Sequence, residues 1–316
     1  MEGEILPLFF CLHPSIGCRF HFRASELYAN FEGMRLARYG EAGFESPAVI
    51  IDGALIDASG EFQQYDEAFF ACGGLAALQA WVEDGCVGGK VLSPDVRRGS
   101  PIARPSKIVC VGKNYAEHVA EFGGDLPVEP VLFMKASSAY SGPNDDVIVP
   151  LKSKHLDYEV ELAIVIGRTA RYVTEESAME YIAGYSVMSD YSEREFQKER
   201  GGQWMKGKSA DSFAPMGPEL VTCDELGDPQ ALRLWTKVNG ELRQNGWTGD
   251  MIFKVPHIVS YVSQFMTLLP GDVIATGTPS GVGMGMEPPN FLESGDRIEL
   301  GIEGIGSISQ RVVSEC

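Results

Sequence analysis

Two glutamates that could share one metal ion, Glu159 and Glu161, alternate with apolar residues in the segment 155–166. Side chains of a β-strand point alternately to opposite faces, so we expect both carboxylates on one face with Cα atoms about 7 Å apart. Covered carboxylates at this spacing repel each other, and a hard divalent cation relieves the repulsion. Ala163 and Val165 share the face, which indicates that it is at least partly covered. The pattern alone leaves two interpretations open, a metal site and a solvated polar face.

A third acid, Asp190, lies in the segment GYSVMSDYSEREFQ, where a short strand is predicted to end and a helix to begin. Ser192 and Glu195 fit a capping box, which predicts that the helix starts here. Arg194 and Gln197 are three residues apart, so they would share one helical face within reach of whatever Asp190 contacts. Taken by themselves, these two residues are more typical of a solvated helix surface.

A possible general base occurs in the segment GKNYAEHVAEFGG. Asn114 as N-cap and Gly123 after the last turn predict a helix of about eight residues, which is too short to be stable unless it packs on other elements. His118 and Glu121 are three residues apart on one face, where the carboxylate can orient the imidazole and raise its basicity. The alternative is an exposed histidine on a surface helix.

The charge balance excludes several classes of partner. The 316 residues include 26 Lys and Arg against 44 Asp and Glu, a formal net charge of −18. This balance disfavours nucleic acid and anionic membrane surfaces, and no run of about 18 apolar residues is present to span a bilayer. The seven scattered cysteines contain no CxxC pair, which is typical of a reducing compartment, so we expect a cytoplasmic protein.

The elements that must position these residues are mostly strands. The 36 glycines favour a turn-rich fold with many short strands, and strand patterns recur to the C-terminus with few helical ones between them. We therefore predict a mainly β fold with a few helices, of the α+β class. An Asp52-Gly53 turn between two strand patterns and a helix within 73–85 predict a small β-rich unit near the N-terminus.

The predicted domain boundaries follow from changes in composition. A loop-rich stretch ends near residue 105, and the first 33 residues show no clear period. The predicted division is an unassigned N-terminal extension at 1–33, a small N-terminal domain at 34–104 and a catalytic domain at 105–316.

Seven motifs, in matching order and spacing, resemble the fumarylacetoacetate hydrolase superfamily, specifically its smaller bacterial-type members. The resemblance runs from about Met34 to Val313 and implies a mixed β-sandwich roll with a small N-terminal β-rich domain. The motifs are VGKNYAEHVAEFG, LFMKASSAYSGPND, DYEVELAIVIG, GYSVMSDYSEREFQ, KGKSADSFAPMGP, LLPGDVIATGTPSGVG and GDRIELGIEGIG.

The resemblance implies a role for each candidate site residue. Glu159, Glu161 and Asp190 correspond to the ligands of a catalytic Mg²⁺, for which Mn²⁺ or Ca²⁺ could substitute, and a 2-oxo acid would bind to this ion. The implied catalytic residues are His118 with Glu121, which would activate a water under a closing lid, and Lys208, which would stabilise an enolate. The implied substrate-binding residues are Arg194, Gln197, Thr278 and Gly277.

The implied reaction is hydrolysis of a C–C bond in a 2,4-dioxo acid of the acylpyruvate type. The substrate could be 2,4-dioxo-3-deoxy-L-rhamnonate or L-fuconate, and the products would be pyruvate and a carboxylic acid. Oxaloacetate decarboxylase, 2-oxo-4-enoate hydratase and ureidoglycolate lyase remain alternatives on the same site. A non-catalytic β protein stabilised by a cation is the alternative of another class. The resemblance also implies a homodimer.

Overall fold

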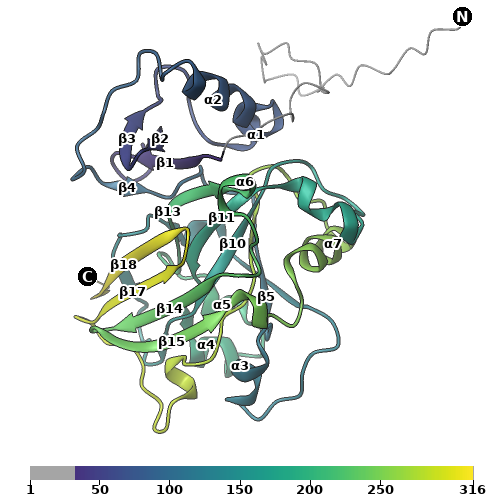
Figure 1. Cartoon of the computed structure of the whole chain (residues 1–316). Coiled ribbons are helices and arrows are strands. Elements are labelled where there is room, and N and C mark those ends of the chain that lie inside the picture. Colours follow the sequence, from purple (N-terminus) through teal and green to yellow (C-terminus); the bar gives the residue numbers. More distant parts are fainter. Residues whose placement is uncertain (1–32, 316) are drawn as a thin grey trace, which may run out of the picture.

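Strands form most of the regular structure, as predicted (Figure 1). The structure is a computed structural model that describes residues 33–315. The predicted extension at 1–33 therefore lies outside the described residues, apart from Gly33. No helix among the described residues is long and apolar enough to cross a membrane.

The described residues form an 11-stranded sheet whose middle is buried on both faces. Neighbours along its main path pair antiparallel, except β16 and β5, which are parallel. Two short strands, β4 (Arg98–Gly99) and β7 (Tyr140–Ser141), pair with β1 and β13. In spatial order the path contains β3 (Ala54–Asp57), β2 (Ser46–Ile51), β1 (Arg35–Tyr39), β13 (Ala214–Thr222), β11 (Ile182–Ser189), β10 (Val160–Ile166), β16 (Val273–Ala275), β5 (Ile108–Gly112) and β6 (Val131–Lys135).

A second sheet of five strands lies beside β10, β11 and β13 (Figure 1). Apolar residues from the facing strands, including Leu162, Leu234 and Leu300, belong to one core cluster, so the two sheets form a sandwich. In spatial order the strands are β15 (Glu241–Trp247), β14 (Arg233–Val238), β17 (Arg297–Ile302), β18 (Gly306–Ser314) and β8 (Val147–Val149), and a separate pair is formed by β9 (Leu156–Asp157) and β12 (Ser192–Glu193).

The predicted N-terminal hairpin is present, because β2 and β3 are joined at Asp52 and Gly53, whose φ angles are 50° and 78°. Two left-handed residues in succession match the twist of a hairpin, and glycine adopts this conformation readily. The unit also contains α2 (Gly74–Glu83), as the helix pattern predicted, and α1 (Glu67–Ala71), which was not predicted. β1 pairs with β13, so the N-terminal unit extends the large sheet. A domain boundary near residue 105 stays a prediction.

The remaining helices are short and lie mainly at the ends of strands. The two helix starts predicted from capping patterns are both wrong. The helices are α3 (Ala116–Ala120), α4 (Arg194–Lys198), α5 (Met205–Lys208), α6 (Cys223–Leu226) and α7 (Val255–Phe265), with 3₁₀ turns η1 (Ser137–Ala139), η2 (Glu175–Tyr181), η3 (Thr248–Asp250) and η4 (Gly283–Gly285).

Tertiary contacts explain both wrong starts. The N-cap of α3 is Tyr115, because the Asn114 side chain instead donates to the carbonyls of Phe253 and Thr276 and accepts from the Phe253 N–H. The N-cap of α4 is Glu193, whose carboxylate accepts from the Glu195 N–H and also from the N–H groups of Lys154 and His155. These contacts tie both short helices to segments that are distant in the sequence.

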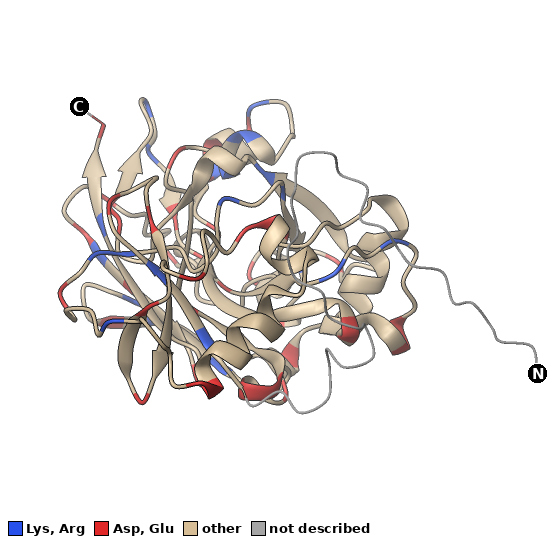
Figure 2. Ribbon diagram, turned by 90° about the horizontal axis from the view of Figure 1, so that it is seen from above, with Lys and Arg blue, Asp and Glu red and all other residues tan. Residues whose placement is uncertain are grey.

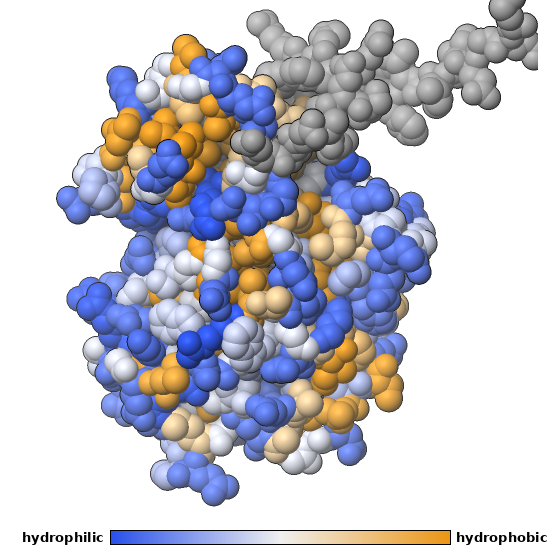
Figure 3. All heavy atoms as spheres, in the orientation of Figure 1, coloured by the Kyte–Doolittle hydropathy of each residue, from blue (hydrophilic) through white to orange (hydrophobic). Residues whose placement is uncertain are grey.

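Acidic residues are spread over many elements rather than gathered at one place (Figure 2). The face in Figure 3 is mostly hydrophilic, with apolar side chains in separate groups, one of them over the N-terminal unit.

Candidate active site

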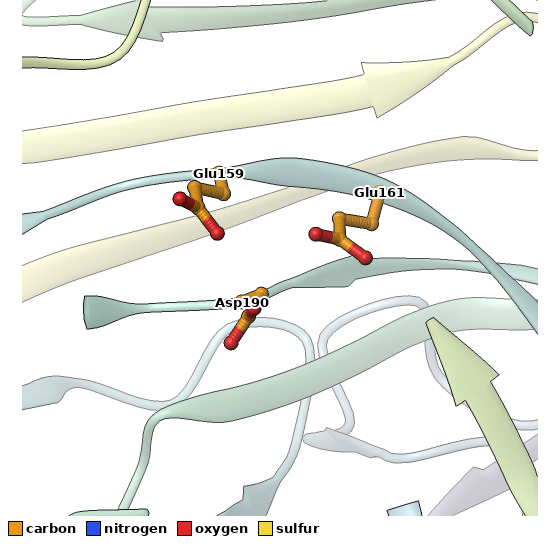
Figure 4. A group of neighbouring side chains, drawn as sticks. All are labelled: Glu159, Glu161 and Asp190. Carbon is orange, nitrogen blue, oxygen red and sulfur yellow. The ribbon is translucent and has the colours of Figure 1, made fainter. Parts of the chain in front are cut away.

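Three buried carboxylates converge at the end of the central strand pair (Figure 4). Glu161 lies in β10, Glu159 comes just before it, and Asp190 directly follows β11. The antiparallel pairing of Val160 with Ser189 brings the third acid beside the first two. One oxygen from each carboxylate lies within 4.8 Å of the others, and all three residues are buried. The predicted alternation along β10 therefore places two of the acids, and sheet pairing supplies the third.

Two lysines compensate part of this negative charge. Lys208 Nζ donates to Glu159 Oε2 at 2.5 Å and to Asp190 Oδ2 at 2.6 Å, and Lys135 Nζ donates to the other oxygen of Asp190. Burial alone would raise the pKa of Glu159, but attraction from Lys208 and Arg194 outweighs it and lowers that pKa. Burial likewise opposes the charge on Lys208, yet Asp190 and Glu159 raise its pKa and keep it a cation.

Glu161 is the uncompensated member of the cluster. Burial first, and then repulsion from Asp190 and Glu159, raise its pKa well above the usual value. Its hydrogen-bond donor is the Gly277 N–H, at 2.8 Å from Oε2. A buried cluster with one unbalanced carboxylate and only oxygen donors fits a hard divalent cation, because such an ion removes the repulsion that burial strengthens. The side chains present therefore fit Mg²⁺, Mn²⁺ or Ca²⁺.

The predicted His118 and Glu121 pair is formed on α3. His118 Nδ1 lies 2.9 Å from Glu121 Oε2, and the histidine is buried. The second carboxylate oxygen of Glu121 accepts from the Gly281 N–H at 2.6 Å, which ties the short helix to the glycine-rich loop 276–285 that follows β16. Phe122 packs edge-on against the imidazole, with ring centroids 5.2 Å apart. Glu121 therefore orients the imidazole and anchors α3 at the same time.

Arg194 and Gln197 are buried, so the interpretation of a solvated helix surface is wrong. Arg194 Nη2 lies 2.8 Å from both Asp157 Oδ2 and Glu159 Oε1, and Nη1 donates to Gln197 Oε1 at 3.2 Å. Asp157 also accepts from the Gly283 N–H at 2.7 Å. It thus joins the guanidinium to the glycine-rich loop and does not belong to the three-acid cluster.

Gly277 and Thr278 belong to the glycine-rich loop and lie where it passes the three-acid cluster. Gly277 has a φ of 98°, and a Cβ there would lie 2.8 Å from the Cβ of Asn114, so this position requires glycine. Its N–H is used by Glu161, and in this structure it orients a carboxylate of the protein. The Thr278 hydroxyl accepts from Gln244 Nε2 at 2.8 Å and is held in one orientation.

One cavity of about 280 Å³ connects these residues. Its wall contains the three acids and nearly all the side chains predicted to act on a substrate, whereas Glu121 stands behind His118. The predicted residues that line it are His118, Glu159, Glu161, Asp190, Arg194, Gln197, Lys208, Gly277 and Thr278. Further lining residues, for which no role was predicted, include Lys113, Phe122, Phe133, Lys198, Trp204 and Met284.

Lys135 is the residue of this site that the sequence interpretation missed. It lies at the end of β6, fully buried, and pairs with Asp190. Burial and the neighbouring Lys208 lower its pKa, against the attraction of Asp190. A lysine that ends an apolar strand was the available signal, since a buried lysine requires a partner carboxylate.

Comparisons with known proteins agree with the architecture. The family profile described as "Fumarylacetoacetate (FAA) hydrolase C-terminal" matches residues 107–313. A 2,4-didehydro-3-deoxy-L-rhamnonate hydrolase from Sphingomonas sp. (strain SKA58) is 45% identical over 282 residues, which cover 88% of this chain and 96% of that protein.

Two solved structures share the fold over nearly their whole length. Fumarylacetoacetate hydrolase from Exiguobacterium antarcticum superposes with a TM-score of 0.77 at 39% identity and covers 89% of this chain and 100% of its own. Maleylpyruvate hydrolase from Sphingobium sp. SYK-6, in complex with manganese(II) and pyruvate, superposes with a TM-score of 0.75 at 29% identity and covers 90% and 100%. The chain therefore belongs to the fumarylacetoacetate hydrolase family of enzymes.

Proposed function

We propose that this protein is a Mg²⁺-dependent hydrolase that cleaves the C–C bond of a 2,4-dioxo acid of the acylpyruvate type. The observation that carries the proposal is one cavity that joins a histidine oriented by a carboxylate to a three-carboxylate cluster and a buried lysine. The names of two relatives, a 2,4-didehydro-3-deoxy-L-rhamnonate hydrolase and a maleylpyruvate hydrolase, support this substrate class.

Glu159, Glu161 and Asp190 would hold the cation. When bound, a divalent ion supplies an electrophile that polarises the oxygens of a 2-oxo acid and stabilises negative charge beside them. Lys208 donates hydrogen bonds to two of these carboxylates, so it competes with a cation for them. It also lines the cavity, where it would lie next to the 2-oxo group of a bound substrate. Arg194, fixed by Asp157, presents a second positive group to the same cavity.

His118 acts as the general base in this proposal. Because Nδ1 is engaged by Glu121, the imidazole keeps Nε2 free to accept a proton from water. The hydroxide adds to the C4 carbonyl carbon, and the C3–C4 bond breaks to leave the carboxylic acid and the enolate of pyruvate. Lys208 stabilises the enolate oxygen, and a proton returned to C3 completes pyruvate. The sum of the steps is one water consumed for each bond broken.

The test is a substrate panel measured with and without EDTA. Acetylpyruvate and the 2,4-dioxo-3-deoxy derivatives of L-rhamnonate and L-fuconate should each release pyruvate together with a second acid. Oxaloacetate serves as the competing substrate, because faster CO₂ release from it would assign the same site to decarboxylation. Loss of turnover in His118→Ala, with thermal unfolding unchanged, would exclude a non-catalytic protein that merely needs a cation.

A further inference from the structure

Two lysines at the mouth of the active-site cavity have no role in the chemistry described above. Lys113 lies in the turn between β5 and α3, with a left-handed φ of 59°, and Lys198 is the last residue of α4. Both are exposed residues, and both line the cavity that contains the three acids and His118. Two short elements thus bring two ammonium groups to one opening.

Both ammonium groups reach the segment that follows α3. Lys198 Nζ lies 4.6 Å from the centroid of the Phe122 ring, and a Cβ placed on Gly124 would lie 4.0 Å from Lys113 Nζ. Partial burial and the nearby Arg194 lower the pKa of Lys198, and repulsion from Lys113 adds to the effect. The two groups are therefore close enough to repel each other, and an anion placed between them would relieve that repulsion.

These lysines differ from the cations that contact the three acids. Lys208 and Arg194, which line the cavity, and Lys135, which does not, each form an ion pair with a buried carboxylate. Within residues 33–315, neither Lys113 nor Lys198 forms an ion pair with a carboxylate. The cavity is consequently lined by four cationic side chains against three carboxylates, in a chain whose net charge is −18, and a bound divalent cation would make it still more positive.

We infer that Lys113 and Lys198 bind a carboxylate at the far end of the substrate's acyl chain, so that the preferred substrate is an acylpyruvate with a second carboxylate. The inference rests on the proposed function and narrows its substrate class, because the names of the relatives do not agree on the chemistry of the acyl chain. A flexible ammonium pair suits a carboxylate better than an uncharged hydroxylated tail, since each ammonium offers only donors and a full charge. The sugar-acid derivatives then become the poorer substrates.

The test uses two ligands that differ only at the far end. 2-Oxoadipate ends in a carboxylate and 2-oxohexanoate in a methyl group, and neither has the 4-oxo group that the reaction requires. Their dissociation constants would be measured by calorimetry in the presence of Mg²⁺ on the wild type, on Lys113→Met, on Lys198→Met and on the double variant. Lys90→Met, at an exposed lysine of the N-terminal unit, is the matched control.

The wild type should bind 2-oxoadipate more tightly than 2-oxohexanoate. In the double variant this preference should fall about tenfold, with smaller losses in the single variants, and the preference should weaken as ionic strength rises. Lys90→Met should behave as the wild type. An unchanged preference in a double variant that still binds 2-oxohexanoate would overturn the assignment, and so would a wild type without preference.

Kinetics separate this inference from the proposed function. The ratio of kcat/KM for fumarylpyruvate to that for acetylpyruvate should fall by the same factor in the double variant, mainly through KM. Absence of pyruvate release from both substrates in the wild type would contradict the proposed hydrolysis. The calorimetric preference would still decide the role of the two lysines in that case, because it requires no turnover.

Discussion

The floor and the mouth of the cavity are built in different ways. On the floor, Glu161 lies in β10, and Glu159 and Asp190 lie next to β10 and β11 in the middle of a sheet, where buried cations pair with two of the three acids. At the mouth, Lys113 lies in the turn before the five-residue helix α3 and Lys198 ends the five-residue helix α4; within the described residues, both are exposed and form no ion pair. Strand pairing fixes the positions of the three acids, so the reaction at the floor can stay the same. Residues in short helices and turns can be replaced with little loss of folding free energy, so the ligand that the mouth binds can change.

Among single substitutions, we expect the greatest loss of activity at Glu161. Glu161→Gln removes a cation ligand and the charge that repels its neighbours, so pyruvate release should fall at least about 1,000-fold, or about 4 kcal/mol. In EDTA the variant should unfold at a temperature no lower than the wild type, because the buried repulsion is gone. Added Mg²⁺ should raise the unfolding temperature of the wild type alone. A variant that still gains stability from Mg²⁺ would place the cation elsewhere.

The second-largest effect is expected at His118, the proposed general base, which lines the same cavity as the three acids and the two lysines. His118→Ala should lower kcat by about 10² to 10⁴, because a positioned general base contributes this range. Thermal unfolding should stay near that of the wild type. His257→Ala is the matched control, since this histidine lies outside the cavity and its Nδ1 lies 3.1 Å from Glu175 Oε2 at the surface. Equal activity in the two variants would remove His118 from the mechanism.

A substitution at Asp157 tests how much the buried ion pairs beside the three acids contribute to the free energy of unfolding. Asp157→Ala leaves Arg194 without one buried partner and frees the Gly283 N–H, so unfolding free energy should fall by about 3 kcal/mol. Denaturant titration would measure the loss. Glu195→Ala, which removes an exposed ion pair with Arg200, should cost less than about 1 kcal/mol. Similar losses in both variants would contradict the distinction between floor and surface.

The smallest effect is expected at the mouth. Phe122 is 38% exposed and lies beneath Lys198, so Phe122→Ala should change kcat/KM by only about two- to five-fold through loss of the cation–π contact. Its unfolding temperature should match that of the wild type. Calorimetry with 2-oxoadipate would show whether the change follows the placement of Lys198. A large loss of stability would mean that this segment supports the core.

The sequence patterns predicted the contacts between side chains that are only a few residues apart in the sequence. The two-residue period of a strand placed Glu159 and Glu161 together, and the three-residue spacing placed Glu121 beside His118. Side chains that serve tertiary contacts were misjudged, because Asn114 resembles a helix cap yet holds two distant loops. Lys135 was missed because its partner, Asp190, is 55 residues away in the sequence.

The resemblance to a family supplied what the residues alone left open. Arg194 and Gln197 have the spacing of a helix surface, and nothing local indicates that Asp157 and Glu159 bury the guanidinium. The proximity of Asp190 to β10 likewise depends on the register of β11, which pairs residues far apart in the chain. Such non-local pairings determine the floor, so they escape an analysis of periodicity and spacing.

In this proposal the three-acid cluster holds a cation that hydrolysis of an acylpyruvate requires. The most direct measurement is the rate of pyruvate release from acetylpyruvate by protein stripped with EDTA, followed as Mg²⁺ is added back to the wild type and to Glu161→Gln. We expect negligible release without metal, saturable recovery in the wild type with one acetate per pyruvate, and no recovery in the variant. Undiminished release from the stripped wild type, or full recovery in the variant, would contradict it.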